Sequence, residues 1–296
     1  MALAAPVTWT YLSIFLLETM MGIFPNVFII RTLHFNHSGR QDLRVIGIVL
    51  RALSISTICH MCMVLVNVST YLFRDLTYAP RYLFYAVRFL ATYTIGCTSW
   101  LTAWLFFYCI KIVTIDSDVF RWIRTNLNTV LCWMMAVSAL IPAVSSSLHV
   151  LGLIKGFAVN GSADNCEKQN VTRPMIKQNL FFLCNCMPYF ILVITTLMTA
   201  IAMKKHSRKM SSTLGACAGA SVATYGGVIR TMVTFLAYYS INLVLTVLYS
   251  MSVFISPQPA FWAVNVFIFS FPLTQSLFII YGTPHLKKAW LQMFYT

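Results

Sequence analysis

Ionisable side chains inside long apolar stretches are the residues of this chain most able to do chemistry. Glu18 lies near the middle of the first apolar stretch, and Asn26 follows two helical turns later. A charged group at that depth in a membrane is costly, so such a residue is usually functional or paired. We expect Glu18 to be a neutral carboxylic acid that hydrogen-bonds to a neighbouring helix, rather than a direct ligand contact.

Catalysis inside a membrane would need further reactive groups at suitable positions. An intramembrane protease uses a pair of carboxylates or a serine–histidine arrangement, but the later apolar stretches contain no Asp or Glu. A retinal Schiff base needs a lysine within the last stretch, whereas Lys287 and Lys288 lie beyond it. The 9 cysteines show no metal-ligand spacing. We therefore expect no enzyme activity, no metal and no cofactor.

Seven apolar stretches hold these residues, and each is long enough to cross a bilayer. A hydrocarbon core of ~30 Å needs about 20 apolar residues in a helix. With 59% hydrophobic and 9% charged residues, a soluble fold is excluded. The sequence predicts an all-α membrane protein, one seven-transmembrane helix bundle over residues 1–296. The predicted spans are Trp9–Ile30, Val45–Val68, Tyr82–Ile112, Leu127–Leu151, Leu180–Met203, Val228–Val253 and Phe261–Tyr281.

The basic residues predict the orientation of the bundle. If the N-terminus is extracellular, most of the 21 Lys and Arg residues lie at cytoplasmic ends, as the positive-inside rule requires. The net charge of +14 then reflects topology and attraction to anionic lipid, not nucleic-acid binding. This orientation places the sequons of Asn160 and Asn170 outside and that of Asn36 inside. We expect a multi-pass plasma-membrane protein with glycan on Asn160 or Asn170 only.

Seven spans with short outer loops and basic inner loops are typical of G-protein-coupled receptor architecture. A proton-coupled transporter is the main non-receptor alternative. The scarcity of carboxylates in the spans weakens it, and seven helices do not divide readily into the repeats that transporters use.

Several local motifs resemble those of the bitter taste receptors, the type 2 taste receptor family. Phe107-Tyr108-Cys109-Ile110-Lys111-Ile112 resembles the family's Phe-Tyr-x-x-Lys-Ile, and Lys205-His206-Ser207-Arg208-Lys209-Met210 resembles its Lys-His-x-x-Lys-Met. The segment from Pro272 to Lys287 is similar to the family's seventh-helix ending. The motifs keep the family order and spacing over six helices. A related vomeronasal type 1 pheromone receptor is the nearest alternative family.

The chain also departs from the family pattern, which indicates a divergent member. Thr57 stands where the family has an arginine in the second helix, and Gln275 replaces a histidine in the seventh. In the family that arginine and the first-helix asparagine contribute to a buried polar network. With Thr57 present, Asn26 needs a neutral partner, for which Ser276 is a candidate. Glu18, Asn26, Thr57 and Ser276 are therefore predicted to be structural polar residues.

Polar side chains among apolar ones on the outer halves of the helices predict a small-molecule pocket. The resemblance places the family's seventh-helix ligand contact at Asn265 and its third-helix contacts near Leu90 and Thr94. Because no acidic residue is in the set, we expect uncharged or anionic, largely apolar ligands, and Arg88 can pair with an anion. The candidate ligand-binding residues are Asn67, Arg88, Phe89, Tyr93, Thr94, Thr98, Asn185, Tyr239, Asn242, Trp262 and Asn265.

The inner surface is predicted to receive a G protein. Tyr108, Lys111, His206 and Arg230 lie at the inner helix ends, where they can frame a cavity for the C-terminal helix of a G protein. The resemblance implies coupling to gustducin and the Gi class. The predicted partners are thus a bitter small-molecule agonist, a heterotrimeric G protein and membrane lipid.

Overall fold

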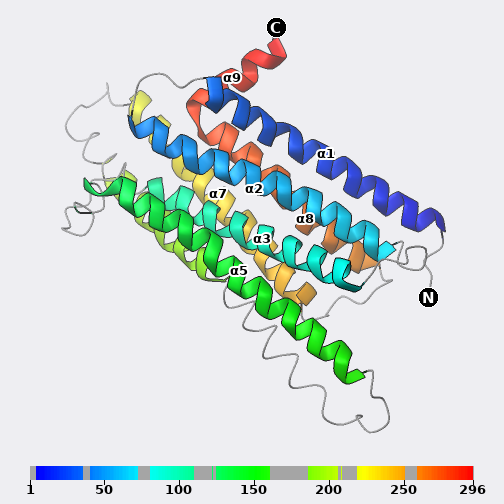
Figure 1. Ribbon diagram of the computed structural model, residues 1–296. Helices are drawn as coiled ribbons and strands as arrows, with labels where there is room; N and C mark the ends of the chain where they lie inside the picture. The colour runs from blue at the N-terminus through cyan, green and yellow to red at the C-terminus, as the bar shows by residue number, and fades with distance from the viewer. Residues whose placement is uncertain are drawn as a thin grey trace.

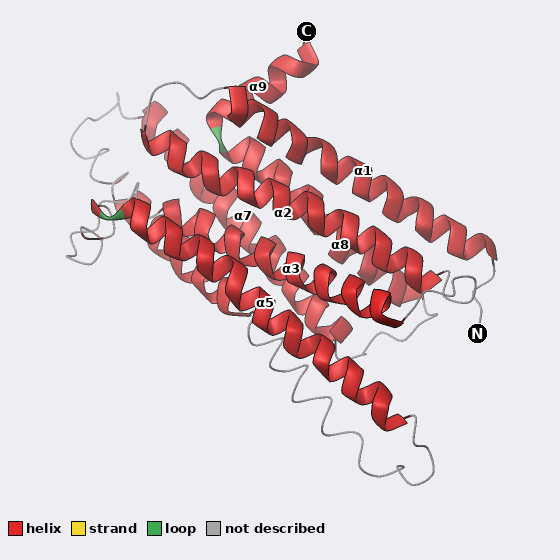
Figure 2. Ribbon diagram, viewed as in Figure 1, coloured by secondary structure: helices red, strands yellow, loops and turns green. Residues whose placement is uncertain are grey.

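A bundle of long helices makes up the described part of the chain (Figure 1). The computed structural model describes residues 5–35, 41–72, 81–109, 122, 125–160, 186–205, 208, 219–250 and 259–295. Every regular element in these ranges is helical (Figure 2). The labelled helices are α1 (Ala5–Phe35), α2 (Gln41–Leu72), α3 (Arg81–Cys109), α5 (Leu127–Asn160), α7 (Gly219–Ser250), α8 (Pro259–Gly282) and α9 (Pro284–Tyr295). A further helical segment covers Cys186–Lys205.

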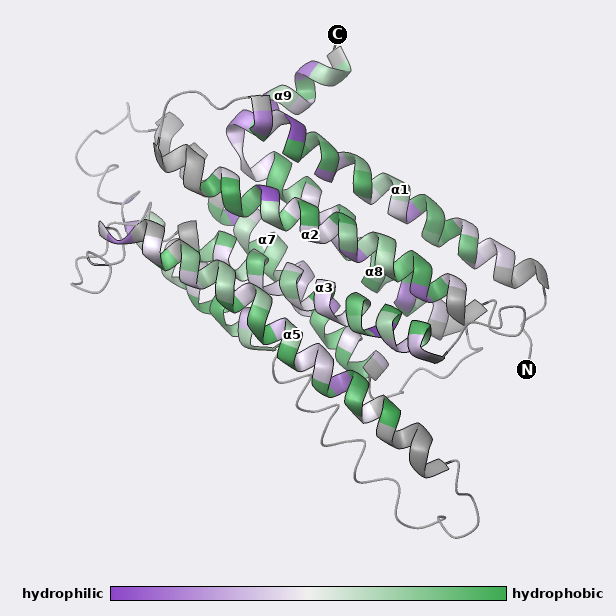
Figure 3. Ribbon diagram, viewed as in Figure 1, coloured by the Kyte–Doolittle hydropathy of each residue, from purple (hydrophilic) through white to green (hydrophobic). Residues whose placement is uncertain are grey.

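Six of the described helices are apolar and long enough to cross a bilayer, and Figure 3 shows apolar residues along their whole length. Large apolar side chains point outward from them, including Leu17, Met20 and Ile201, which are 59%, 64% and 68% exposed. Such a surface is stable only against lipid. The spans are Trp9–His34, Ile46–Ser69, Cys132–Gly152, Cys186–Lys205, Ile229–Tyr249 and Trp262–Gly282.

Helix α3 is less apolar than these six because it lies inside the bundle. Its 29 residues extend about 43 Å at 1.5 Å per residue, enough to cross a bilayer. It packs against both α2 and α5, and its Thr92, Thr94, Thr98 and Thr102 are buried. With α3 as the third span, the all-α, seven-helix membrane architecture is confirmed.

Contacts between the first and last spans close the bundle. Helix α2 packs against α1 and α3, α3 packs against α5, and α8 returns to contact α1, α2 and α7. The chain starts α1 at one end of the bundle and extends α9 from the other (Figure 1). Residues at the start of α1, the end of α2 and the start of α8 therefore share one end, the end predicted to be extracellular.

Several helices extend past the predicted spans. Helix α5 continues beyond Leu151 to Asn160, so Asn160 is the last residue of a helix and not, as predicted, a loop residue. Its apolar run continues through Val159, and Gly161 follows in the sequence, where a glycine commonly ends a helix. Helix α7 begins at Gly219 instead of Val228. Predicted span residues 110–112, 180–185 and 251–253 lie outside the described residues.

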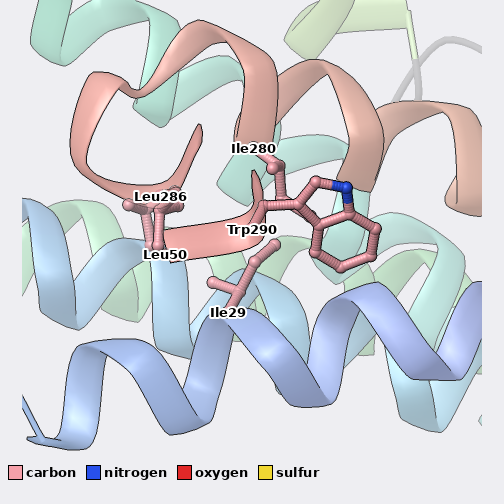
Figure 4. Close-up of a cluster of buried hydrophobic side chains, with 5 residues drawn as sticks. All are labelled: Ile29, Leu50, Ile280, Leu286 and Trp290. Atoms are coloured by element: carbon pink, nitrogen blue, oxygen red, sulfur yellow. The ribbon is translucent and has the colours of Figure 1, made fainter. Parts of the chain in front are cut away.

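Helix α9 is a short helix that the span analysis did not predict. Its 12 residues are too few to cross a bilayer, and Pro284 starts it at the position where helices best accept proline. Leu286 and Trp290, one turn apart, are buried against Ile29, Leu50 and Ile280 (Figure 4). Lys287 and Lys288 stay exposed. The helix is therefore held by its apolar face against α1, α2 and α8, at the end of the bundle where α1 finishes.

Helices α3 and α5 approach closely at a glycine. A Cβ atom built on Gly96 would lie 2.7 Å from Pro142 Cβ and 3.1 Å from its Cγ. Proline has a rigid ring that cannot rotate away, so only glycine fits at this crossing without a shift of the helices. Small residues at such crossings let membrane helices pack by van der Waals contact.

Candidate ligand site and polar core

Helix α8 carries two different faces, and the predicted ligand residues divide between them. One face points to α1: the Trp262 ring stacks on Tyr11 with centroids 4.3 Å apart, and Phe269 meets Phe15 edge-on at 5.2 Å. Asn265, which is buried, lies between Trp262 and Phe269 on the same helical stripe. We call this stripe the α1-facing face of α8.

The other face of α8 contacts α7. The Tyr238 and Ser270 hydroxyl oxygens are 3.1 Å apart, and Thr274 Oγ1 donates to the Tyr238 hydroxyl at 3.3 Å. The Phe271 ring meets Tyr239 edge-on at 5.2 Å. Tyr239 therefore lies on the α7 side of α8, whereas Trp262 and Asn265 lie on the stripe that contacts α1. The predicted pocket residues do not gather into one cluster.

An aromatic cluster surrounds Tyr239. Leu192, Phe235 and Tyr239 are buried together, and Tyr189 stacks on Tyr239 with centroids 5.9 Å apart. Phe106 of α3 stacks on Phe235 at 4.9 Å. The cluster thus joins α3, the Cys186–Lys205 segment, α7 and α8. Its rings fill the interior between the helices that were predicted to form the pocket.

The predicted residues on α3 point in more than one direction. Thr98 shares a hydrogen bond of 3.0 Å with Ser56 of α2, which directs this face of α3 toward α2. Thr94 lies one turn outward on the same face and is buried. Phe89 and Tyr93 stack on each other at 6.0 Å. The Arg88 guanidinium lies 5.9 Å from the centroid of Phe84, and its Nε is buried without a hydrogen-bond partner among the described residues.

Asn242 has a structural partner. Its Nδ2 donates to the Ile268 carbonyl oxygen at 3.4 Å, the carbonyl that Pro272 leaves without its usual donor four residues later. This contact satisfies a backbone group within the membrane. Asn67 is partly buried on α2, on the same stripe as His60 and Val64. Asn185 lies outside the described residues.

Two buried amides join α8 to other helices. Asn26 Nδ2 donates to Ser276 Oγ at 2.6 Å and to the Gly22 carbonyl at 2.8 Å. Gln275 Nε2 donates to Thr102 Oγ1 of α3 at 2.6 Å. Thr57 does not replace the family's arginine as a long-range partner, since its hydroxyl donates to the Leu53 carbonyl of its own helix at 2.8 Å.

A small cavity opens among α1, α2 and α8. Glu18 and His60 both line it, together with Phe15, Thr19, Met61, Val64, Phe269 and Pro272. Glu18 Oε2 and His60 Nδ1 are buried and have no hydrogen-bond partner among the described residues. His60 was not among the predicted site residues. The sequence does contain an indication of its role, because His60 is an ionisable residue in the middle of the second span.

The opposite end of the bundle is basic. Its exposed basic side chains are Arg31, Lys204, Lys205, Arg230 and Lys287. Helix α1 ends, α7 begins and α9 lies at this end (Figure 1). Of the predicted G-protein contacts, Arg230 is therefore on an accessible surface. Tyr108 belongs to the last turn of α3, whereas Lys111 and His206 lie outside the described residues.

Comparison with known proteins identifies the family. The family model for taste receptor protein (TAS2R) matches residues 3–296. The chain belongs to the type 2 taste receptor family. It is 22% identical over 289 residues to taste receptor type 2 member 39 of Macaca mulatta, with 95% of this chain and 85% of the relative covered. It is 22% identical over 288 residues to member 40 of Gallus gallus, with 94% and 91% covered.

This taste receptor is a divergent member, as predicted. Its identity to member 9 of Macaca mulatta is 24% over 293 residues, with 93% of this chain and 90% of the relative covered. The family match decides between the two chemosensory families considered above, in favour of taste over vomeronasal receptors. The chain is a membrane-embedded chemosensory receptor. Receptors of this kind work by binding a small molecule and signalling through a G protein.

Proposed function

We propose that this chain is a G-protein-coupled receptor for bitter small molecules that activates a G protein of the gustducin/Gi class. The match of the taste receptor model over residues 3–296 carries this proposal. The single seven-helix domain, the extracellular N-terminus and the plasma membrane location belong to the same proposal. The basic end of the bundle supports that orientation, because cytoplasmic ends retain Lys and Arg.

The ligand site is proposed to lie in the outer half of the bundle, along the α1-facing face of α8. Asn265 and Trp262 are both buried there, and Asn67 lies on the stripe of α2 that carries His60 and Val64, which face α1 and α8. A buried amide can both donate to and accept from a ligand. This mixture of aromatic rings and a few polar groups is typical of small-molecule sites.

The other candidate residues take different parts in this proposal. Tyr239 and its aromatic cluster are proposed to form the wall of the ligand side that α7 provides. Thr98 bonds to Ser56 of α2, and Thr94 lies on the same face of α3. These two residues are therefore proposed to hold α3 against α2. Arg88, with its buried Nε unpaired among the described residues, is the group available to an anionic ligand. Asn242 supports the proline position of α8 and is proposed to affect stability more than binding.

Signalling is proposed to occur at the basic end. An agonist shifts the population of receptor states only if it binds the inwardly open state better than the closed state. Arg230 is exposed at the start of the span Ile229–Tyr249 of α7, where it can contact an inserted G-protein helix. Tyr108, Lys111 and His206 complete the proposed surface.

A ligand screen tests the proposal. The chain is expressed with a gustducin-type chimeric G protein, and calcium release is measured for a panel of bitter compounds and a panel of steroid-like compounds. We expect a response to at least one bitter compound. A response to steroid-like compounds alone contradicts the bitter assignment. Ligand uptake into vesicles that contain the purified chain, without any G protein, would support a transporter instead.

A further inference from the structure

We propose that Glu18 and His60 are bridged by one buried water molecule that ties α1 to α2. The two side chains come from different helices and line the same cavity. Glu18 Oε2 and His60 Nδ1 each lack a hydrogen-bond partner among the described residues. His60 is only 9% exposed. A buried polar atom without a partner is costly, so two residues that line one cavity and each carry such an atom indicate an occupant that bonds to both.

The size of the cavity fits a single water molecule. It offers about 10 Å³ to the centre of a water-sized sphere, which is close to the space that one buried water needs. A ligand of drug size needs a site of at least about 300 Å³. The remaining walls of the cavity are apolar and come from Phe15, Met61, Val64, Phe269 and Pro272. The occupant therefore has to be small and has to find its partners among the few polar atoms.

The available partners match the hydrogen-bonding capacity of water. Thr19 lines the same cavity, and its hydroxyl already donates to the Phe15 carbonyl at 2.7 Å, so only its oxygen lone pairs remain available. A neutral His60 Nδ1 can accept as well, whereas Glu18, as the neutral acid expected above, can donate its O–H. Buried waters typically make about three hydrogen bonds. A water that accepts from Glu18 and donates to His60 Nδ1 and Thr19 Oγ1 meets that requirement.

A transition-metal ion fits the site less well. Structural zinc is held by four ligands, usually Cys and His with some carboxylate. The described residues contain no group of three or more His, Cys, Asp or Glu side chains that could hold a metal. Glu18 and His60 alone leave such an ion short of ligands. A water molecule needs only the hydrogen-bond partners that Glu18, Thr19 and His60 provide.

The bridge predicts that Glu18 and His60 are energetically coupled. Removing either partner leaves the water and the other partner incompletely bonded, so the second removal costs little more. We expect Glu18→Leu and His60→Leu in the full chain in nanodiscs each to lower Tm by roughly 2–4 °C. The double variant should melt no more than about 1 °C below the less stable single variant. Tm shifts that add in the double variant would overturn the bridge.

A matched control uses another buried polar residue on α2. Ser54 is 1% exposed, its hydroxyl has no partner among the described residues, and it does not line the cavity. Glu18→Leu combined with Ser54→Ala should give additive Tm shifts. Coupling of the same size in this control pair would mean that α1 and α2 respond as a whole and would remove the support for a specific bridge.

Two further measurements identify the occupant even if a variant fails to fold. A density map of the native receptor at a resolution that shows ordered water should contain one peak within hydrogen-bond distance of Glu18 and His60, and a cavity without that peak contradicts the proposal. Melting in sodium, potassium and choline chloride at equal ionic strength should give the same Tm. A stabilisation specific to sodium that Glu18→Gln abolishes would assign the site to a sodium ion instead.

Discussion

Asn26 on α1 donates a hydrogen bond of 2.6 Å to the Ser276 hydroxyl on α8, and both residues are 1% exposed. The Ser276 hydroxyl in turn donates a hydrogen bond to the Pro272 carbonyl at 2.8 Å. A short chain of hydrogen bonds therefore runs from the first span to the carbonyl of the proline in the last span. Side chains far apart in the sequence are fixed to each other in the middle of the membrane.

This link predicts a measurable coupling between the two residues. Asn26→Ala should lower the free energy of unfolding by about 0.5–2 kcal/mol, since interhelical hydrogen bonds in membranes are of that size. Ser276→Ala should remove most of the same energy, and the double variant should lose little more. Thermal unfolding in detergent measures each variant. As a control, Asn26→Ala with Thr199→Ala should be additive, because the bond that Thr199 makes among the described residues is to its own helix, at the Thr195 carbonyl. Full additivity for Asn26 with Ser276 would contradict the link.

The crossing of α3 and α5 gives a second prediction. Gly96→Ala places a methyl group against Pro142, whose Cβ would be 2.7 Å away, and should cost about 1–3 kcal/mol, as overpacking does. Gly47→Ala is the matched control, because a Cβ there meets no atom within 4 Å and alanine favours the helix. We expect a lower Tm for the first variant and an equal or higher Tm for the second. Equal Tm values for both variants would show that the helices are not in close contact at Gly96.

Glycosylation tests the proposed orientation. Asn160 closes α5 at the end of the bundle away from the exposed Lys and Arg residues, so a glycan there or on Asn170 is expected, and none on Asn36. Glycosidase treatment should shift the native receptor on a gel, and removal of both Asn160 and Asn170 should abolish the shift. A shift that persists in that double variant and disappears with Asn36→Gln would reverse the orientation.

The basic end predicts a separation of binding from signalling. Arg230→Ala should leave agonist affinity nearly unchanged but reduce G-protein activation several-fold, because Arg230 is exposed at the end opposite the ligand site. Lys111→Ala is expected to behave in the same way. Arg31→Ala, an exposed basic residue at the end of α1, serves as the control and should retain activation. Loss of agonist affinity in Arg230→Ala would refute this division of roles.

The fold was largely predictable because each span has to satisfy its backbone inside the lipid. Long apolar stretches therefore had to be helices. Helix ends were less predictable: α5 runs on to Asn160 and α7 starts at Gly219, since hydropathy marks the membrane core and not the last helical turn. Helix α9 was missed because its apolar face, Leu286 and Trp290, occupies only one side of a short helix.

The site was harder to predict than the fold. Helical periodicity places Trp262 and Asn265 on one stripe and Phe271 and Thr274 on another, but it does not reveal that the first stripe meets α1 and the second meets α7. His60 was not predicted because a single histidine within a span matches none of the catalytic arrangements considered above. An imidazole in the middle of a span indicates a functional or paired residue, for the same reason that the Glu18 carboxyl does.

The proposed ligand site depends most directly on Asn265. Leaving the polar group of a ligand unpaired costs about 1–3 kcal/mol, which is about one to two decades of affinity. Asn265 is 5% exposed on the α1-facing face of α8. Ser270 lies on the opposite face of the same helix, bonded to Tyr238. It provides a matched control for any general effect of a substitution in α8.

The deciding measurement is the concentration–response curve for G-protein activation by an active bitter compound, taken for the native chain, Asn265→Ala and Ser270→Ala at equal surface expression. We expect the native receptor to respond, Asn265→Ala to require at least about tenfold more compound, and Ser270→Ala to follow the native curve. Unchanged potency in Asn265→Ala for every active compound would contradict the placement of the ligand on the α1-facing face of α8.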